Sequence, residues 1–388
     1  MTATERPYQP ARGGSYLTQD FDRSPFTVAW EITRSCALAC VHCRAEAIPK
    51  RDPRELTTDE ARNLIDQVVD IGKPILVVTG GDPMMRRDVY DLLEYGVSHG
   101  LRMALSPSAT ALVTHRALER VRDIGVSMVH ISLDGADAAA HDRFRGVAGS
   151  FERTMRILRD CRELGLSVQI GTSVARRNLA ELPAIAARVR EAEARVWSLF
   201  FLVPTGRGRV EDMIAPQEQE AALDWLYDIS RDAPFHVRTA VTPAYRRVVI
   251  QRRREEERAS EEATSATITW EQTGAGYSFR QANAPTGQGV NDGKGFCFIS
   301  HIGDVYPSGF LQLSAGNVRK QSLSSIYRDS TLFRELRDPA LLKGACGQCE
   351  FRAVCGGSRA RAYAMTGDYL ASDPSCPYIP KALRGAHA

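Results

Sequence analysis

Short apolar runs alternate with amphipathic stretches along the first half of the chain. The apolar runs predict strands at residues 26–32, 75–79, 102–106, 127–133, 167–174 and 196–203. The stretches between them predict helices at 58–71, 88–99, 114–124, 150–164 and 179–193, with a last helix at 216–231. Near-continuous apolar strands that alternate with helices are typical of a parallel sheet buried on both faces. Six such units in a row predict an α/β fold, a partial, TIM-like (β/α)6 barrel.

The rest of the chain changes in composition. Residues 243–262 are strongly charged, with three arginines followed directly by three glutamates, which predicts a solvated helix with intrahelical ion pairs. Residues 263–295 are rich in Gly, Thr, Asn and Gln and predict a long loop or linker. We therefore expect an N-terminal extension (1–25), a barrel core (26–232), a charged helix with a linker (233–295) and a small cysteine-rich domain (296–388).

Overall composition narrows the partners of the protein. The chain has 43% hydrophobic and 25% charged residues, a composition typical of an ordinary globular protein. Its net charge of +3 favours neither nucleic acid nor an acidic membrane as a partner. No apolar run reaches the roughly 18 residues of a membrane span. The first 25 residues lack the apolar core of a signal peptide. We expect a cytoplasmic protein that binds neither nucleic acid nor membranes.

Nine cysteines are many for such a protein. Disulfides are disfavoured in the cytoplasm, so clustered cysteines there are more often metal ligands. Three of the nine lie within residues 36–43 and five within residues 297–376. The ninth, Cys161, lies in a predicted helix and is interpreted as a small buried hydrophobe.

The first cysteine group, Cys36, Cys40 and Cys43, directly follows the first predicted strand, with gaps of three and two residues. Three cysteines on one loop can ligate three irons of a [4Fe–4S] cluster and leave the fourth iron open to a small molecule. Electron-transfer clusters normally use four cysteines, so this pattern indicates a cluster that does chemistry. Zinc is the alternative, because CxxC pairs are common zinc ligands and His42 lies nearby. The spacing favours iron–sulfur.

This CxxxCxxC spacing resembles the signature of the radical S-adenosylmethionine (SAM) superfamily, and the resemblance covers about residues 26–203. Four further motifs follow the next three strands in the order of that family. Residues 80–83 (Gly-Gly-Asp-Pro) resemble its Gly-Gly-Glu-Pro, and residues 106–109 (Ser-Pro-Ser-Ala) take the place of its Ser-Thr-Asn-Gly. After the fourth strand, residues 132–135 match its Ser-Leu-Asp-Gly and residues 141–146 its His-Asp-x-x-Arg-Gly.

The resemblance implies how such a site works. The three cysteines hold a catalytic [4Fe–4S] cluster, and SAM binds its open iron. An electron from a donor such as flavodoxin or ferredoxin then cleaves SAM to a 5′-deoxyadenosyl radical, which abstracts hydrogen from a substrate carbon. By the same resemblance Ser132 and Arg145 contact the SAM ribose and carboxylate. The expected SAM-binding residues are Gly80, Gly81, Asp82, Pro83, Ser106, Ser108, Ser132, Arg145, Thr172 and Asn178.

The second cysteine group consists of Cys346, Cys349, Cys355 and Cys376, which can fully ligate either zinc or a second [4Fe–4S] cluster. It resembles the SPASM extension of many radical SAM enzymes, which in full carries seven cysteines and two auxiliary clusters.

Two positions of the SPASM pattern are not cysteine in this chain. Ser308 stands at one, and Arg359 stands near the other. The resemblance therefore implies a single auxiliary cluster and a vacant second site. Cys297 matches the first SPASM position. It is then either a buried thiol or a residue that faces the substrate.

Three functions remain open. The stretch from Cys355 to Cys376 resembles the enzymes of haem d1 and alternative haem synthesis, which implies that the enzyme modifies a tetrapyrrole. The N-terminal half also resembles maturases of ribosomally made peptides, such as the mycofactocin maturase, which would need a precursor peptide and a separate peptide-recognition protein. The third is a zinc-stabilised protein without catalysis. Arg359 and Arg361 meet either substrate carboxylates or local acids such as Asp368 and Asp373.

Overall fold

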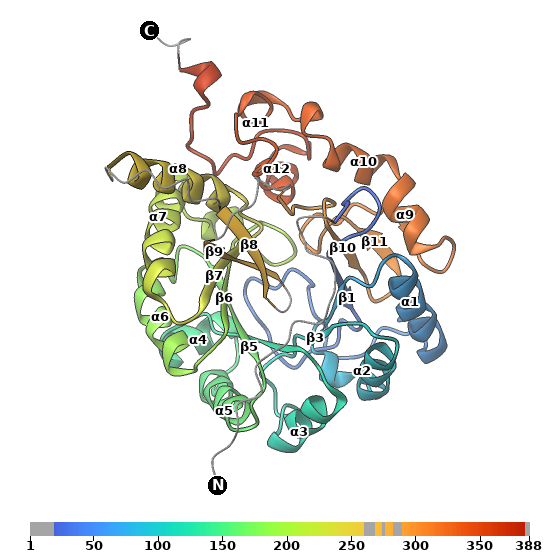
Figure 1. Cartoon of the computed structure of the whole chain (residues 1–388). Coiled ribbons are helices and arrows are strands. Elements are labelled where there is room, and N and C mark those ends of the chain that lie inside the picture. The colour runs from blue at the N-terminus through green and yellow to red at the C-terminus, as the bar shows by residue number, and fades with distance from the viewer. Residues whose placement is uncertain (1–18, 260–267, 274–275, 282–288, 385–388) are drawn as a thin grey trace.

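Ten strands form one curved sheet in the structure, a computed structural model that describes residues 19–259, 268–273, 276–281 and 289–384 (Figure 1). Their order is β12-β11-β10-β1-β2-β3-β4-β5-β6-β7. The strands are β1 (Thr27–Glu31), β2 (Ile75–Thr79), β3 (Met103–Leu105), β4 (Met128–Ser132), β5 (Val168–Val174), β6 (Val196–Phe201), β7 (His236–Ala240), β10 (Phe296–Ile299), β11 (Asp304–Tyr306) and β12 (Gly316–Asn317). Strands β10 and β1 to β7 run parallel, which confirms the six predicted strands and the open α/β barrel.

Helices cover the outside of this sheet (Figure 1). Those around the barrel are α1 (Thr58–Asp70), α2 (Val89–Ser98), α3 (His115–Ile124), α4 (Ala138–Arg145), α5 (Ser150–Glu163), α6 (Leu182–Glu191), α7 (Pro216–Asp232) and α8 (Ala244–Ala259). Helix α1 shows why they form: Thr57 and Glu60 make a reciprocal capping box at its start. Its apolar residues, spaced i, i+3, i+4 and i+7, are buried in the core: Ala61, Leu64, Ile65 and Val68.

Two parallel strands were not predicted. Strand β7, His-Val-Arg-Thr-Ala, mixes polar and apolar residues because it ends the sheet beyond β6. Strand β10 pairs with β1, with Phe296 opposite Thr27, although 269 positions separate the two in the sequence. The cysteine-rich segment from residue 296 is therefore continuous with the barrel sheet through its first strand.

The segment expected to be a loop, residues 263–295, contains a hairpin of β8 (Ile268–Thr273) and β9 (Gly276–Gln281). The expectation of a long loop or linker is thereby corrected for the residues of the hairpin, and β9 lies beside β7 (Figure 1). Residues 260–267, 274–275 and 282–288 lie outside the described part of the chain, as do residues 1–18 of the expected N-terminal extension. Phe21 of that extension is buried, and its carbonyl accepts a hydrogen bond from Tyr327.

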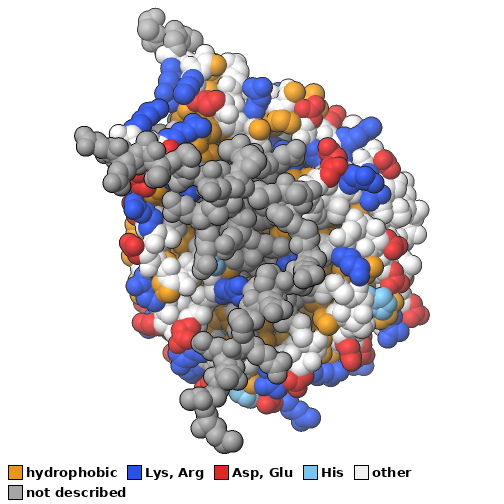
Figure 2. Space-filling model, viewed as in Figure 1, with side chains coloured by type: hydrophobic (Ala, Val, Ile, Leu, Met, Phe, Trp, Pro, Cys, Tyr) orange, Lys and Arg blue, Asp and Glu red, His pale blue; other side chains and the backbone are white. Residues whose placement is uncertain are grey.

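The expected charged helix is present as α8. The ion pairs of its residues Arg252 and Glu256, however, are formed with the neighbouring helix α7. Arg252 lies 2.6 Å from Asp228, and Glu256 lies 2.8 Å from Arg231. The expected intrahelical pairing is corrected for these two residues, because α7 packs along α8 and presents the opposite charges. On the face shown in Figure 2, acidic and basic side chains are interspersed around the rim.

Four short helices complete the C-terminal part: α9 (Leu323–Asp329), α10 (Thr331–Arg337), α11 (Gly344–Gln348) and α12 (Arg359–Thr366). In the second cysteine group, Cys346 lies on α11, Cys349 and Cys355 lie between α11 and α12, and Cys376 lies in the segment after α12. Every helix in the described part of the chain is too short or too polar to span a membrane.

Candidate active site and second cysteine site

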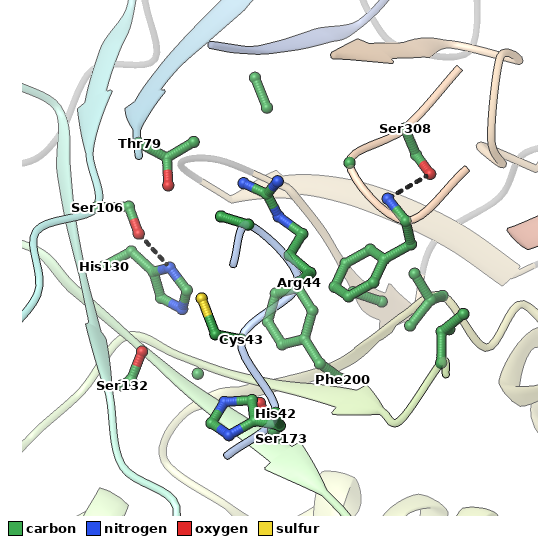
Figure 3. Close-up of a pocket in the computed structure, with 18 of the residues that line it drawn as sticks. His42, Cys43, Arg44, Thr79, Ser106, His130, Ser132, Ser173, Phe200 and Ser308 are labelled. Atoms are coloured by element: carbon green, nitrogen blue, oxygen red, sulfur yellow. Dashed lines mark hydrogen bonds between the residues drawn. The ribbon is translucent and has the colours of Figure 1, made fainter. Parts of the chain in front are cut away.

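A cavity of about 400 Å³ lies inside the barrel, where the ends of several strands meet (Figure 3). Most of the predicted site residues line it, although they come from five separate segments of the chain. These are Cys36, Cys40, Cys43, Gly80, Gly81, Ser106, Ser108, Ser132 and Arg145. Parallel strands bring their carboxyl ends to one edge, which is why motifs that are distant in sequence converge here.

The three cysteines lie on the loop after β1 and form no disulfide. Cys36 and Cys40 are each 8% exposed. Each sulfur faces at least one donor: the Leu38 amide for Cys36 (3.3 Å), the Ala47 amide for Cys43 (3.4 Å) and the Arg145 guanidinium for Cys40 (3.6 Å). Donors aimed at sulfur stabilise thiolates, the form that binds iron. The loop therefore fits a [4Fe–4S] cluster held by three cysteines.

Gly80 and Gly81 bring the loop after β2 against the cysteine loop. A Cβ on Gly81 would lie 2.5 Å from the carbonyl oxygen of Arg34 and 2.6 Å from that of Ser35. A Cβ on Gly80 would lie 2.5 Å from the carbonyl oxygen of Thr33. Both glycines are thus required by the backbone that leads into Cys36, in addition to lining the cavity.

The serines after β3 point in two directions. The Ser108 hydroxyl donates to the Gly81 carbonyl (2.6 Å) and lies 3.5 Å from the sulfur of Cys36. The Ser106 hydroxyl lies 3.0 Å from Nδ1 of His130, whose ring stacks on Phe200 (Figure 3). Burial lowers the pKa of His130 to about 3, so this ring is neutral at pH 7.

Arg145 connects the cavity wall to the cysteine loop. Its Nη2 lies 2.7 Å from the buried Asp134, while Nη1 faces Cys40. Asp134 is fixed in turn by the Ser173 amide at 2.7 Å. The pair therefore holds a guanidinium in place beside the expected cluster, with a defined orientation.

Four predicted SAM contacts are not brought into the cavity. The buried carboxylate of Asp82 accepts hydrogen bonds from Thr110 Oγ1 (2.7 Å) and the Met84 amide (3.1 Å), and Pro83 begins the short turn that follows. Thr172 donates to the Leu133 carbonyl on the outer side of β5. Asn178 bonds only backbone groups of the neighbouring loops. These side chains stabilise the loops that carry the site.

The cavity also contains arginines that the sequence did not single out. Arg44, Arg207, Arg238 and Arg246 line it together with Arg145, and among the described residues Asp292 is the one acidic residue of the lining. Arg207 lies in Pro-Thr-Gly-Arg-Gly, which follows β6, and its Nε and Nη2 are buried without a hydrogen-bond partner among the described residues. The rule that located the other motifs, polar residues after a strand, would have found it.

Arg44 belongs to a buried ionic network. It donates to Glu31 (2.9 Å) and stacks 4.4 Å from the centroid of Phe298. His301, from the turn after β10, lies 3.2 Å from the same carboxylate. Burial alone would raise the pKa of Glu31, but Arg44, His301 and Arg34 outweigh it and lower the pKa to about 2. The network joins the cysteine loop to the C-terminal segment.

The second cysteine group lies outside this cavity. Its members are Cys346, Cys349, Cys355 and Cys376, all part-exposed and free of disulfides. Backbone amides donate to two of the sulfurs: Asp373 to Cys346 and Gly357 to Cys355, each at 3.4 Å. Four cysteines with such donors fit a fully ligated cluster.

Neither cysteine group has the spacing of a zinc site. Tetrahedral zinc with bonds of about 2.3 Å holds its sulfurs roughly 3.8 Å apart. Among the described residues no three cysteine sulfurs lie within 4.8 Å of one another. The sulfurs of each group are therefore too far apart to ligate one tetrahedral zinc ion as they stand.

Side chains of the C-terminal segment decide two alternatives that the sequence left open. Cys297 is fully buried in the core, outside the cavity lining, so the buried-thiol alternative is confirmed and the substrate-facing one is wrong. Arg361 pairs with Asp373 at 3.2 Å, the local acid that the sequence suggested. Arg359 is also buried outside the cavity lining and donates to backbone carbonyls and to Cys346. Ser308, by contrast, lines the cavity.

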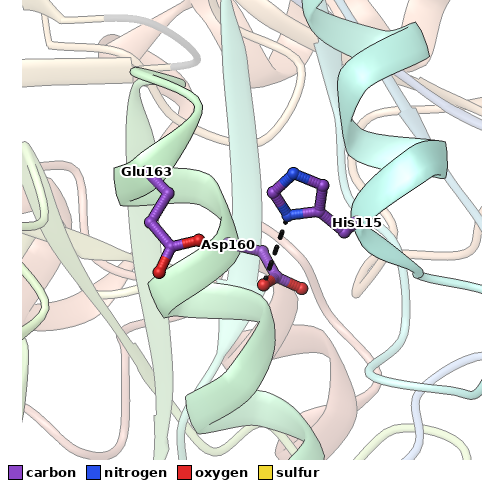
Figure 4. Close-up of side chains that lie close together, drawn as sticks. All are labelled: His115, Asp160 and Glu163. Atoms are coloured by element: carbon purple, nitrogen blue, oxygen red, sulfur yellow. Dashed lines mark ion pairs between the residues drawn. The ribbon is translucent and has the colours of Figure 1, made fainter.

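Another group of possible metal ligands lies on the outer helices: His115 of α3 with Asp160 and Glu163 of α5 (Figure 4). Nδ1 of His115 lies 3.5 Å from Asp160. His115 and Glu163 are exposed, and we interpret the contact as an ion pair between packed helices.

Comparisons with known proteins agree with this geometry. The model of the radical SAM superfamily matches residues 30–188, and that of an iron–sulfur cluster-binding domain matches residues 291–350. An AdoMet-dependent heme synthase of Nitratidesulfovibrio vulgaris is 43% identical over 96% of this chain and 98% of its own length. A mycofactocin maturase of Mycobacterium tuberculosis is 30% identical over 93% of this chain and 85% of its own length.

A solved structure shares the fold. SuiB of Streptococcus suis, bound to its precursor peptide SuiA, superposes with a TM-score of 0.66 over 92% of this chain and 76% of that chain. The two sequences are 16% identical, so this likeness concerns the fold alone.

Proposed function

The chain belongs to the radical SAM superfamily, and from this premise we propose that it is a haem synthase that decarboxylates propionate side chains of a haem precursor. One observation carries the proposal: the 43% identity to an AdoMet-dependent heme synthase over nearly the full length of both chains. The identity to a peptide maturase is lower, at 30%.

Cys36, Cys40 and Cys43 hold the catalytic [4Fe–4S] cluster in this proposal. When bound, the cluster and SAM supply a 5′-deoxyadenosyl radical that abstracts hydrogen from a substrate carbon. Ser132 and Arg145 contact the ribose and the carboxylate of SAM. The walls of the barrel keep water and other hydrogen donors away from the reacting carbon.

The charge of the cavity supports a substrate that carries several carboxylates. Within the described part of the chain, five arginines and one aspartate line it, and a guanidinium binds a carboxylate through two parallel hydrogen bonds. Arg207 is the best candidate, because two of its nitrogens are buried without a partner among the described residues. A buried donor that lacks a partner in the protein costs free energy, which a bound carboxylate would offset.

The chemistry requires an electron acceptor. Hydrogen abstraction from the carbon next to the macrocycle leaves a radical on the propionate side chain. The bond to the carboxylate then breaks, carbon dioxide leaves, a vinyl group forms and one electron remains. We assign the uptake of that electron to one auxiliary [4Fe–4S] cluster on Cys346, Cys349, Cys355 and Cys376. A flavodoxin or ferredoxin supplies the electron that cleaves SAM. The burial of Cys297 in the core supports a single auxiliary cluster.

The direct test is anaerobic incubation of the reconstituted enzyme with dithionite, SAM and iron coproporphyrin, an iron porphyrin with four propionates. We expect 5′-deoxyadenosine and a porphyrin product that has lost carbon dioxide and two hydrogens for each propionate converted, detected by mass spectrometry. An unchanged porphyrin, together with modification of a precursor peptide encoded near the gene, would contradict the proposal in favour of a peptide maturase.

Arg207 provides a second prediction. Replacement by Gln should weaken binding of iron coproporphyrin about 10- to 100-fold, because a hydrogen bond to a charged group contributes about 1.5–3 kcal/mol. Arg207→Lys should retain part of the affinity. Binding is measured by absorbance titration of the cluster-loaded enzyme. Arg177→Gln is the matched control, since Arg177 pairs with Asp212 and does not line the cavity; equal affinities of the Arg207→Gln and Arg177→Gln proteins would exclude the role.

A further inference from the structure

Arg359 is a buried cation whose surroundings differ from those of the other arginine in its helix. It begins α12, is 1% exposed, and follows the turn that contains Cys355. Arg361, also 1% exposed, pairs with the carboxylate of Asp373. Within the described part of the chain, no carboxylate forms such an ion pair with Arg359.

The guanidinium of Arg359 is instead held by neutral backbone groups and one sulfur. Nη1 donates to the carbonyls of Tyr369 (2.8 Å) and Ala371 (2.7 Å), and Nε donates to that of Gly357 (3.3 Å). Nη2 points at the sulfur of Cys346, at 3.6 Å. Three carbonyl contacts fix the plane of the guanidinium, so its contact with sulfur is built into the fold.

Gly357 provides the space in which this contact forms. A Cβ at this position would lie 2.6 Å from Nη2 of Arg359 and 2.9 Å from the sulfur of Cys346. The backbone at Gly357 has a φ of +64°, a conformation that glycine adopts readily. The local sequence Cys-Gly-Gly-Ser-Arg therefore places a cation directly against one proposed cluster ligand.

A buried guanidinium requires negative charge nearby. Asp292 and Asp368 act on Arg359 electrostatically without forming an ion pair, and the sulfur of Cys346 is the acceptor of opposite charge that the guanidinium contacts directly. Cys346 supplies the negative charge only as a thiolate, and a [4Fe–4S] cluster with four thiolate ligands is anionic in both of its common states. The Asp373 amide is a second donor to the same sulfur. Donors and positive charge next to cluster sulfurs stabilise the reduced, more negative state and raise the reduction potential.

We propose that Arg359 raises the reduction potential of the auxiliary cluster, so that the cluster can accept the electron left when carbon dioxide leaves the substrate. This inference rests on the proposed function and on the ligand set assigned there. The cluster is reduced by this one electron, and an external electron carrier then takes the electron from the cluster. Arg359 touches a cluster ligand and not the substrate, so its role is to set a potential.

The test isolates the auxiliary cluster in a Cys36→Ala, Cys40→Ala, Cys43→Ala background. The cluster is titrated with dithionite and monitored by EPR, with Arg359 intact, as Arg359→Met and as Arg359→Lys. The comparison is made at the midpoint potential of the parent protein, where half of its clusters are reduced. At that potential we expect the ratio of reduced to oxidised cluster in Arg359→Met to be about tenfold lower. For a one-electron couple this corresponds to a midpoint potential that is lower by about 59 mV. Arg359→Lys, which keeps the charge, should fall less.

The outcomes separate the two proposals. A parent background that holds no [4Fe–4S] cluster would contradict the ligand set and hence the proposed function. A cluster with the same midpoint potential in all three proteins would overturn the role of Arg359 and leave the proposed function intact. Loss of the cluster from both Arg359 variants would also overturn it, because Arg359 would then be required for assembly and not for the potential.

Discussion

Replacement of Cys36 by alanine is expected to reduce 5′-deoxyadenosine formation to the background level. The chain offers three thiolates to the catalytic cluster, and all three sulfurs lie on one loop that lines the cavity. Removal of one leaves two ligands for three irons, and no other cysteine lines this cavity. The measurement is the amount of 5′-deoxyadenosine formed anaerobically with dithionite and SAM, determined by chromatography.

Cys161→Ala is the matched control, because it removes another buried cysteine far from the cavity. Cys161 is fully buried in α5 and belongs to the apolar core. Its replacement should lower the free energy of unfolding by about 1 kcal/mol and leave 5′-deoxyadenosine formation unchanged. Wild-type levels of 5′-deoxyadenosine in the Cys36→Ala protein would show that the loop does not hold the catalytic cluster.

The strand-end argument predicted much of the site because it depends on topology. A polar residue that follows a parallel strand reaches the carboxyl edge of the sheet, and this placed Cys36, Ser106 and Ser132 in one cavity. The same argument does not tell which way a side chain turns. Thr172 lies on β5 but faces outward, and Asn178 closes a loop with backbone bonds.

Other features depend on contacts between segments far apart in the sequence. Strand β10 was not predicted because its partner β1 lies at the opposite end of the chain. Strand β7 carries the cavity residue Arg238, but it is too polar to stand out as a buried strand. The contact between Arg359 and Cys346 requires the turn geometry at Gly357, which no spacing rule describes.

Replacement of Gly81 by alanine is expected to remove the catalytic cluster while the auxiliary cluster remains. The added Cβ would lie 2.5 Å from the carbonyl oxygen of Arg34 and 2.6 Å from that of Ser35, and these backbone atoms cannot rotate away as a side chain would. Hydrogen bonds already join the two loops: the Asp82 amide donates to the Ser35 carbonyl at 2.7 Å. Overpacking of this kind costs about 1–3 kcal/mol. Here the backbone that must move lies directly before the cluster ligand Cys36.

Iron content after anaerobic reconstitution measures the effect. It should fall from about eight to about four irons per chain, since each cubane contains four. The matched control is Gly165→Ala, at the end of α5, where φ is +68° and an added Cβ meets no atom within 4 Å. That variant should lose about 1 kcal/mol of stability through backbone strain and keep both clusters. If Gly81→Ala also kept both clusters, the close approach of the two loops would not be needed to assemble the catalytic site, and the glycines would serve SAM alone.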